Sequence, residues 1–477
     1  MNRTNAIANP TGNATATVPG VNLLALRSHN AALVLDLLRA AGAEGISRLE
    51  LAERTGLTPQ AVSKITARLR TEGLATQAGH RASTGGKPRT VLRLVPQAGH
   101  AVGVHLDRDE VRVVLVDLVG SVVGERRAPL DLGAGAEAVI EGVAGVVEAL
   151  LGGGGGVGEV GTLPLGRGPG ETVVLPGGGP GETDGPLGGG PGETDGPLGG
   201  GPGGSGGFEG AGGSGQSGGS GGSGEFGGSG GSGQFRGSRG FEESRGSGRS
   251  GGPGTQGVAL LGVGVALPGP LDHVRGVLHR VTGFPEWDGF PLRDALARRL
   301  GVPVAVDKDT NAAALGLAVG GEGGSFAYLH LGTGLGAGLV IGGALHRGAR
   351  TGAGEFGHQV IQLDGPPCGC GDRGCIEALC LGAVARGDLD EAARVLGAGA
   401  ANLVGLLDID RVLLGGRTVA AEPERFVRGV AAVLAGRARR EGADQAVPVR
   451  VAPGGARVVA EGAAQLLLAP LFGRADG

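Results

Sequence analysis

The sequence predicts an α/β protein that begins with a helical module and is interrupted near its middle. Three observations carry this prediction. Apolar residues recur at helical spacing in the first hundred residues, strand-like and helix-like segments alternate over 100–151 and again over 258–472, and a Gly-rich stretch separates these two segments. Only 3% of the residues are aromatic, so Val, Leu, Ile and Ala must supply the core.

The N-terminal module, residues 23–95, follows a loose tail at 1–22. Helical spacing predicts helices over 30–41 and 59–72. Between them, Ser47 and Glu50 have the S-x-x-E spacing of a capping box, and Thr58 followed by Pro59 is a typical helix start. Two strand-like segments follow the last helix. This order is typical of a winged helix-turn-helix, whose second helix reads DNA.

Polar residues on the outer face of the second helix are candidates for DNA contact: Thr58, Gln60, Ser63, Lys64 and Arg68. The turn between the two strands, 83–89, adds Lys87 and Arg89, which suit a phosphate backbone or a narrow minor groove. Residues 23–95 hold eleven Lys and Arg against five Asp and Glu, in a chain of net charge -4. Local basic excess is what DNA binding requires. The alternative is a helical interaction module with a solvated basic face.

The segment 152–257 is rich in Gly, Ser and Pro and contains the repeat PGETDGPLGGG at 180–190 and again at 191–201. Such a composition buries too little apolar surface to offset chain entropy, so we expect a disordered linker. It interrupts an α/β domain instead of separating two domains. We interpret it as a degenerate expansion or an error in the gene sequence, with an interaction tail as the alternative.

All four cysteines lie between Cys368 and Cys380. The N-terminus lacks the apolar stretch of an export signal, so we expect a cytoplasmic protein in which such a cluster binds metal. Zinc favours four N or S ligands in a tetrahedron, and the intervening glycines let the backbone wrap one ion. We predict a structural zinc site of His358, Cys368, Cys370 and Cys375. A chance cluster or a redox pair would leave the histidine unexplained.

These residues belong to a wider resemblance. GAGEFGH at 352–358 followed by CGCGDRGCIE at 368–377 resembles the zinc signature of the ROK family, which groups bacterial repressors, uncharacterised reading frames and sugar kinases. Further matching segments are LPGPLD at 267–272, DKDTNAAAL at 307–315, LGTGLGAGLVIGGALHRGA at 331–349 and LLGGR at 413–417. The resemblance covers about 23–151 and 258–472. It implies a two-lobed, actin/hexokinase-like (ribonuclease H-like) domain of the ATPase type behind the winged helix.

The resemblance also implies roles for individual residues. Asp309 stands at the position of the general base that takes a proton from a sugar hydroxyl. The implied sugar-binding residues are Lys308, Asp309, Asn311, Glu355, His358 and Glu377. The implied second phosphate loop contains Gly332, Thr333, Gly334 and Gly336. On its own, Asp309 would read equally well as a solvated loop residue.

One departure from the family pattern concerns ATP. The kinases begin with a D-x-G-G-T loop, but here His105 replaces the aspartate, and Asp107 and Arg108 replace the two glycines. Backbone amides can then no longer approach a triphosphate, and Asp107, Asp109 and Glu110 place like charges beside it. Lys308 replaces an asparagine, and we expect it to pair with Asp309 and weaken it as a base.

The sequence therefore favours a sugar-responsive repressor of carbohydrate-utilisation genes over an enzyme. The expected partners are double-stranded operator DNA, a sugar or sugar phosphate, and a second copy of the chain in a homodimer or higher homo-oligomer. The alternative is an ATP-dependent, glucokinase-like sugar kinase with an added DNA-binding domain. A third interpretation is a decayed relic that neither binds sugar nor folds stably.

Overall fold

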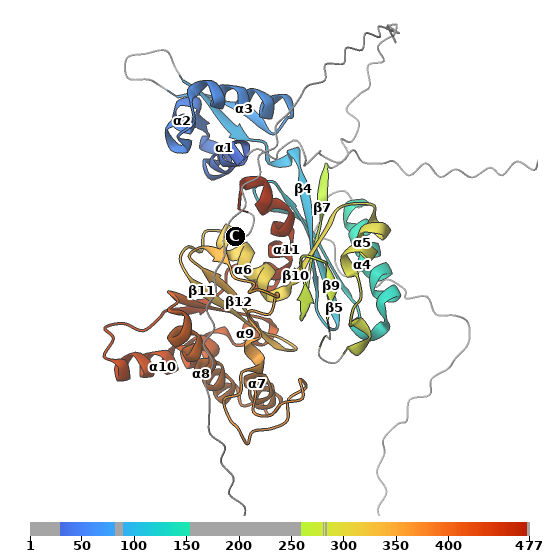
Figure 1. Cartoon of the computed structure of the whole chain (residues 1–477), viewed down its shortest axis with the longest axis vertical. Helices are drawn as coiled ribbons and strands as arrows, with labels where there is room; N and C mark the ends of the chain where they lie inside the picture. Colours follow the sequence, from blue (N-terminus) through green and yellow to red (C-terminus); the bar gives the residue numbers. More distant parts are fainter. Residues whose placement is uncertain (1–28, 82–88, 153–258, 280, 282–283, 475–477) are drawn as a thin grey trace, which may run out of the picture. The chain divides into compact units, whose positions relative to one another are not determined.

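The computed structural model describes residues 29–81, 89–152, 259–279, 281 and 284–474 (Figure 1). The tail expected at 1–22, Lys87, and the linker expected at 152–257, except for its first residue, lie outside the described residues. Among the described residues, no helix is long and apolar enough to cross a membrane.

The N-terminal module combines three helices with a small antiparallel sheet of order β1-β3-β2. Its elements are α1 (His29–Ala40), β1 (Ile46–Ser47), α2 (Arg48–Thr55), α3 (Pro59–Thr71), β2 (Ala75–Arg81) and β3 (Arg89–Leu94). The expected capping box starts α2: the Glu50 amide donates to Ser47 Oγ over 3.3 Å, and the Ser47 amide donates to Glu50 Oε2 over 2.8 Å. Thr58 caps α3 by accepting from the Ala61 amide at 3.2 Å.

The first lobe contains a five-stranded sheet of order β10-β7-β4-β5-β6. Its strands are β4 (His100–Leu106), β5 (Glu110–Asp117), β6 (Val122–Pro129), β7 (Leu260–Leu267) and β10 (Val304–Lys308). β4 pairs with β7 in parallel, so segments on both sides of the Gly-rich stretch share one sheet. The sequence predicts two strands and a helix over 100–151. It misses β6, because this edge strand is mostly half-exposed and carries three charged residues in a row, which hides any alternation.

The second lobe repeats this topology. Its sheet has the order β13-β12-β11-β14-β15, in which β11 pairs antiparallel with β12 and parallel with β14. The strands are β11 (Phe326–Leu331), β12 (Leu335–Ile341), β13 (Ala344–Leu345), β14 (Arg411–Gly415) and β15 (Val449–Val451). Each lobe therefore consists of an antiparallel three-stranded meander extended by two parallel strands. The expected two-lobed α/β architecture is confirmed.

Helices cover both sheets (Figure 1). In the first lobe, α4 (Ala136–Gly152) and α5 (Leu292–Leu300) pack on one face, while α11 (Val458–Leu468) packs on the other with α6 (Asp309–Val319) against it. The second lobe adds α7 (Ile376–Ala385), α8 (Leu389–Leu407), α9 (Arg417–Ala421) and α10 (Pro423–Glu441).

Two glycines on neighbouring strands bring α11 directly onto the first sheet. Gly103 and Gly264 are register partners on β4 and β7. A Cβ at Gly103 would lie 1.9 Å from the carbonyl oxygen of Ala460, and one at Gly264 would lie 1.8 Å from that of Ala463. Only glycine permits so close an approach. One region between the lobes receives residues from the turns after β4 and β11 and from the N-termini of α6, α7 and α9.

Candidate functional site

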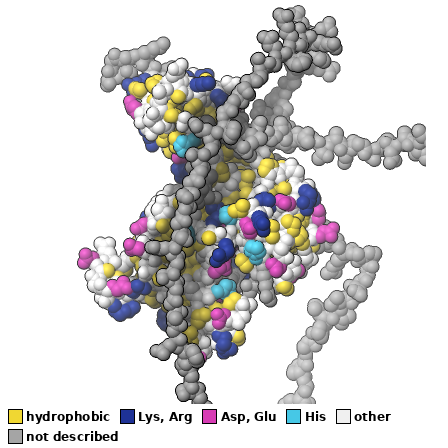
Figure 2. Space-filling model, viewed as in Figure 1, with side chains coloured by type: hydrophobic (Ala, Val, Ile, Leu, Met, Phe, Trp, Pro, Cys, Tyr) yellow, Lys and Arg dark blue, Asp and Glu magenta, His cyan; other side chains and the backbone are white. Residues whose placement is uncertain are grey.

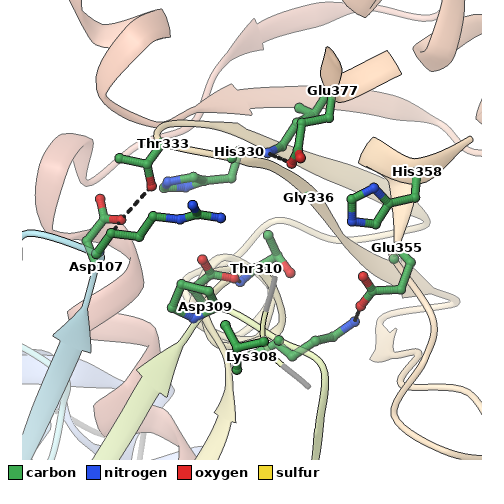
Figure 3. Close-up of a pocket in the computed structure, with 17 residues that line it drawn as sticks. Asp107, Lys308, Asp309, Thr310, His330, Thr333, Gly336, Glu355, His358 and Glu377 are labelled. Carbon is green, nitrogen blue, oxygen red and sulfur yellow. Dashed lines mark hydrogen bonds and ion pairs between the residues drawn. The ribbon is translucent and has the colours of Figure 1, made fainter. Parts of the chain in front are cut away.

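A polar pocket lies between the two lobes (Figure 3). It receives residues from the turn after β4, the β10–α6 junction, the β11–β12 turn, the 3-10 turn Phe356–His358 and the start of α7. The predicted site residues that line it are Lys308, Asp309, Thr333, Gly334, Gly336, Glu355, His358 and Glu377. Its volume is about 80 Å³. That is less than the roughly 150 Å³ of a cavity that holds benzene.

Asp309 is the first residue of α6 and lies at the base of this pocket (Figure 3). Its Oδ1 accepts the Thr310 amide at 2.6 Å. Burial, helped by the nearby carboxylates of Asp107 and Glu355, raises the pKa of the Asp309 carboxyl to about 7. A carboxyl with this pKa can accept or donate a proton near neutral pH.

The sequence predicts that Lys308 pairs with Asp309, but in the structure Lys308 has other partners. Its Nζ donates to Glu355 Oε1 over 3.0 Å and to the Ala353 carbonyl over 2.5 Å, and its side chain is only 3% exposed. The ammonium lowers the pKa of Asp309 less than burial raises it. The pairing expected from adjacency was wrong because Glu355 lies 47 residues away and reaches the same place through the fold.

Asn311 lies behind the pocket and does not line it. Its fully buried side chain donates from Nδ2 to Asp307 Oδ1 over 2.9 Å. Asp307 also pairs through Oδ2 with Arg347 Nε at 2.7 Å and accepts the Lys308 amide. These contacts fix the β10–α6 junction, so Asn311 positions Lys308 and Asp309. Sequence reasoning missed Arg347, since no local pattern links it to Asp307.

Glu355, His358 and Glu377 continue the wall of the pocket that Asp309 begins (Figure 3). Glu377, in the first turn of α7, accepts the Leu335 amide at 2.8 Å and thereby ties α7 to the start of β12. His358 ends the 3-10 turn. With Asp309 and Lys308, this wall surrounds the space with hydrogen-bond acceptors and one ammonium, a set that suits a polyhydroxy ligand.

The predicted metal ligands gather beside this wall. One ligand atom from each of His358, Cys368, Cys370 and Cys375 lies within 4.8 Å of the others. Cys370 Sγ and Cys375 Sγ are 3.8 Å apart, and His358 Nδ1 is 3.6 Å from Cys368 Sγ. A zinc tetrahedron with bonds of about 2.3 Å has S–S edges of about 3.8 Å, so the residues fit this ion.

Cys380 stands apart from the cluster. It is fully buried on α7, where its Sγ donates to the Ala392 carbonyl at 3.4 Å. His358, in contrast, belongs to both the cluster and the pocket. When Nδ1 faces the metal, Nε2 is left to contact a ligand.

The phosphate-loop residues form the tight turn between β11 and β12. Thr333, Gly334 and Gly336 line the pocket, whereas Gly332 closes the turn by donating its amide to the Gly334 carbonyl at 2.9 Å. Thr333 Oγ1 donates to Asp107 Oδ1 of the other lobe over 2.9 Å. The only hydroxyl among the predicted phosphate-loop residues is therefore bound to a carboxylate.

Arg417, at the start of α9, completes this bridge. Its Nη2 lies 2.5 Å from both Asp107 Oδ2 and Asp109 Oδ1, and its Nη1 donates to Asp109 Oδ2 over 2.9 Å. Although burial opposes ionisation, hydrogen bonds led by the one from Arg417 lower the pKa of Asp107 to about 2. We call Asp107, Asp109, Thr333 and Arg417 the interlobe clasp.

The clasp corrects the electrostatic picture expected from sequence. Asp107 and Asp109 share one basic partner, Arg417, and Glu110 pairs instead with Arg112 and Arg127. Each of these carboxylates thus has a basic partner, and the polar groups on this side of the pocket are bonded to one another.

Two histidines stand next to the clasp. His105 and His330 have ring centroids 6.2 Å apart, and His330 Nδ1 lies 2.9 Å from the Tyr328 hydroxyl. Burial lowers the pKa of His105 to about 3 and that of His330 to about 4. Both are neutral at pH 7. Neither therefore supplies the negative charge of the aspartate that the D-x-G-G-T pattern has at the position of His105.

The described candidate DNA-contact residues are all exposed on the N-terminal module. Their side chains lie outside the buried face of α3, which consists of Val62, Thr66 and Leu69. The exposed residues are Thr58, Gln60, Ser63, Lys64, Arg68 and Arg89. Arg68 Nε also pairs with Glu72 at 2.8 Å. Basic side chains are visible on this module in the face drawn in Figure 2.

Comparison with known proteins identifies the family. Residues 254–388 match the ROK family. The kanosamine kinase of Amycolatopsis mediterranei is 34% identical over 213 residues, which cover 38% of this chain and 68% of that enzyme. The chain belongs to the ROK family.

Shorter matches reach both branches of the family. A glucokinase of Thermotoga maritima is 43% identical and a xylose repressor of Caldicellulosiruptor bescii is 38% identical, each over 121 residues. These matches cover 24% and 25% of this chain, and only 38% and 30% of those relatives. The crystal structure of a ROK family transcriptional regulator, a homolog of the E. coli MLC protein, shares the fold. Its TM-score is 0.61 at 17% identity, over 93% of this chain and 96% of that one.

Proposed function

We propose that this protein is a DNA-binding transcriptional repressor of carbohydrate-utilisation genes that senses a sugar or sugar phosphate with its kinase-like domain. The observation that carries the proposal is the division of the interlobe pocket. One wall presents Asp309, Glu355 and Glu377 to a ligand, while the interlobe clasp fills the other wall. Such a pocket suits binding without phosphoryl transfer.

Ligand binding then changes the arrangement of the two lobes. The pocket is too small for a sugar ring in the closed arrangement, so a ligand binds a more open one and shifts the balance between the two. The N-terminal module packs on the same domain through a shared apolar cluster that includes Leu38 and Phe472. A change between the lobes therefore has a route to the DNA-binding surface.

The proposed output is operator binding by residues 23–95 in a homodimer. The exposed side of α3 enters the major groove, and Arg89 lies at the base of the proposed wing. A two-fold dimer would read a palindrome whose half-sites are separated by about one helical turn of DNA or a multiple of it.

Zinc, held by His358 and the three clustered cysteines, would be structural, because four protein ligands leave no open coordination position. Its contribution to sensing is to fix His358. The ring is then held in one orientation, with its second nitrogen available to the sugar.

DNA binding is tested by fluorescence anisotropy of the full chain with fragments from upstream of its own gene. We expect Lys64→Ala to weaken binding uniformly and to reduce the salt dependence by about one phosphate contact. Arg440→Ala removes the same charge from the exposed end of α10 and should leave binding unchanged. Equal effects of both variants, or no binding at low salt, would contradict the proposal.

A sugar kinase is the second candidate, favoured by the pKa of Asp309 and by the similarity to kinases. A coupled assay of ATP consumption over a panel of hexoses distinguishes the two functions. We expect no turnover above background. Turnover that Asp309→Asn abolishes would establish the kinase instead.

A further inference from the structure

A second cavity lies where helix α1 of the N-terminal module meets α6 and α11 of the kinase-like domain. Its volume is about 230 Å³, larger than that of the interlobe pocket. The β5–β6 turn forms one side of it, and the C-terminal end of α6 and the first turns of α11 form the others. It shares no lining residue with the interlobe pocket.

Arg39, in the last turn of α1, brings a guanidinium to this cavity. Its Nη2 donates to the Val119 carbonyl over a long 3.4 Å, and its Nη1 is buried without a hydrogen-bond partner. The group lies 4.8 Å above the Phe472 ring. The nearby carboxylate of Asp36 is already held by Arg474 at 2.9 Å. Arg39 therefore keeps a buried donor that no group among the described residues uses.

Gln465, on α11, supplies the complementary group. Its side chain is 6% exposed, and its Oε1 is buried without a hydrogen-bond partner. A Cβ placed on Gly120 would lie 3.2 Å from Gln465 Nε2 and 3.6 Å from Arg39 Nη2, so both side chains converge on this glycine. Buried polar groups without partners are rare and disfavoured, and a bound molecule is one way to satisfy them.

The rest of the lining defines the chemistry of such a molecule. Leu317 and Val458 are apolar, whereas Glu461 is an acceptor. Hydroxyl groups can accept from Arg39 and donate to Gln465 and Glu461, while C–H groups of a ring pack on the apolar side. An anion would suit Arg39 alone and would be repelled by Glu461.

We propose that this cavity is a second ligand site, for a small neutral polyhydroxy molecule of the size of one sugar ring, held between Arg39 and Gln465. The volume exceeds the roughly 150 Å³ that accommodates benzene. The site goes beyond the proposed function, since the interlobe pocket and its residues take no part in it. A ligand here joins α1 to α11 and fixes the N-terminal module on the domain that carries it.

Calorimetric titration of the full chain with D-glucose, D-xylose and myo-inositol at millimolar concentration tests the site. We use the Asp309→Asn background, which weakens the interlobe site. At least one of the three probes should bind with one molecule per chain, and adding Gln465→Leu should weaken that binding at least tenfold. Arg39→Met should weaken it as well, whereas Arg440→Met, which removes the same charge on α10, should not.

The outcomes separate the two sites. Gln465→Leu replaces an unsatisfied amide by an apolar side chain of similar size, so its melting temperature should equal or exceed that of the parent. Absence of binding by all three probes in the Asp309→Asn background overturns the second site, and so does binding that Gln465→Leu leaves unchanged. In either case, sugar binding by the wild-type chain that Asp309→Asn weakens would leave the proposed function standing.

Discussion

The two walls of the interlobe pocket contrast sharply. On one wall, Asp309, Glu355 and Glu377 line the pocket with carboxyl oxygen atoms. On the other, Asp107 and Arg417 bind each other and Thr333, so the groups that could hold a phosphate hold one another. One wall thus leaves acceptor oxygens facing the pocket, and on the other wall the polar groups are bonded to one another.

This contrast teaches that the chemistry of a two-lobed domain is decided at a few turn residues. The sheets of both lobes have the same topology, and the β11–β12 turn keeps its glycines. The turn after β4 differs from the D-x-G-G-T pattern of the kinases, because Asp107 and Arg108 stand where that pattern has glycines. An arginine at the start of α9 then finds a carboxylate partner in the opposite lobe.

The largest expected effect on stability concerns the cluster of predicted metal ligands, His358, Cys368, Cys370 and Cys375. Structural zinc in small domains contributes on the order of 10 kcal/mol to folding. We expect a chelator, or Cys375→Ser, to lower the melting temperature by about 10 °C or more and to abolish sugar binding. Differential scanning fluorimetry with metal analysis measures both. Cys380→Ala is the matched control, and an equal loss of metal in it would show that the cluster has been wrongly assigned.

The next effect concerns Asp309. Its pKa is raised by burial to about 7, and the carboxylate accepts hydroxyl hydrogen bonds better than the acid. Sugar affinity should therefore rise as the pH increases through about 7. In the ligand-free protein the sign is opposite: this group adds stability that is complete below its unfolded pKa and is lost as the pH rises towards 7.

Calorimetric titration between pH 5.5 and 8.5, read against the pKa of about 7, measures this dependence. Asp309→Asn should flatten it and weaken binding by about tenfold or more. Asp364→Asn, an exposed acid outside the pocket, serves as the control. An unchanged pH profile in Asp309→Asn would assign the dependence to another group.

A smaller effect concerns the interlobe clasp. Arg417 is 46% exposed, so solvent screens its ion pairs, and we expect Arg417→Ala to cost about 1–2 kcal/mol in the free energy of unfolding. Because the lobes then separate more readily, sugar should associate faster, as stopped-flow fluorescence would measure. Arg425→Ala, whose pair with exposed Asp390 is 3.5 Å long, should cost less than about 0.5 kcal/mol. A slower association would show that the clasp does not hold the pocket closed.

Local signals allowed much of this molecule to be predicted. The capping box at Ser47 and the start of α3 at Thr58 depend on residues three positions apart, and the structure contains both. The metal ligands also come close together, because short spacings with glycines restrict where the side chains can go.

Long-range contacts could not be predicted in this way. Arg417 and Asp107 are 310 residues apart, and Lys308 and Glu355 are 47 apart, so no periodicity or spacing connects them. The sequence therefore showed that Asp107 and Arg108 replace the glycines of the family pattern, but it did not reveal that Asp107 pairs with Arg417. The β6 strand was missed for a different reason, since its charged residues remove the alternation that identifies strands.

The pairing of β4 with β7 has a consequence for the covalent chain. These neighbours in the first sheet come from opposite sides of the segment 153–258, so hydrogen bonds and buried side chains join them independently of the peptide that links them. The entropy of closing such a loop grows only slowly with its length, so natural variation in length here is inexpensive. A chain divided within this segment would yield two complementary fragments, and their co-purification would show that the fold, not the linker, keeps the halves together.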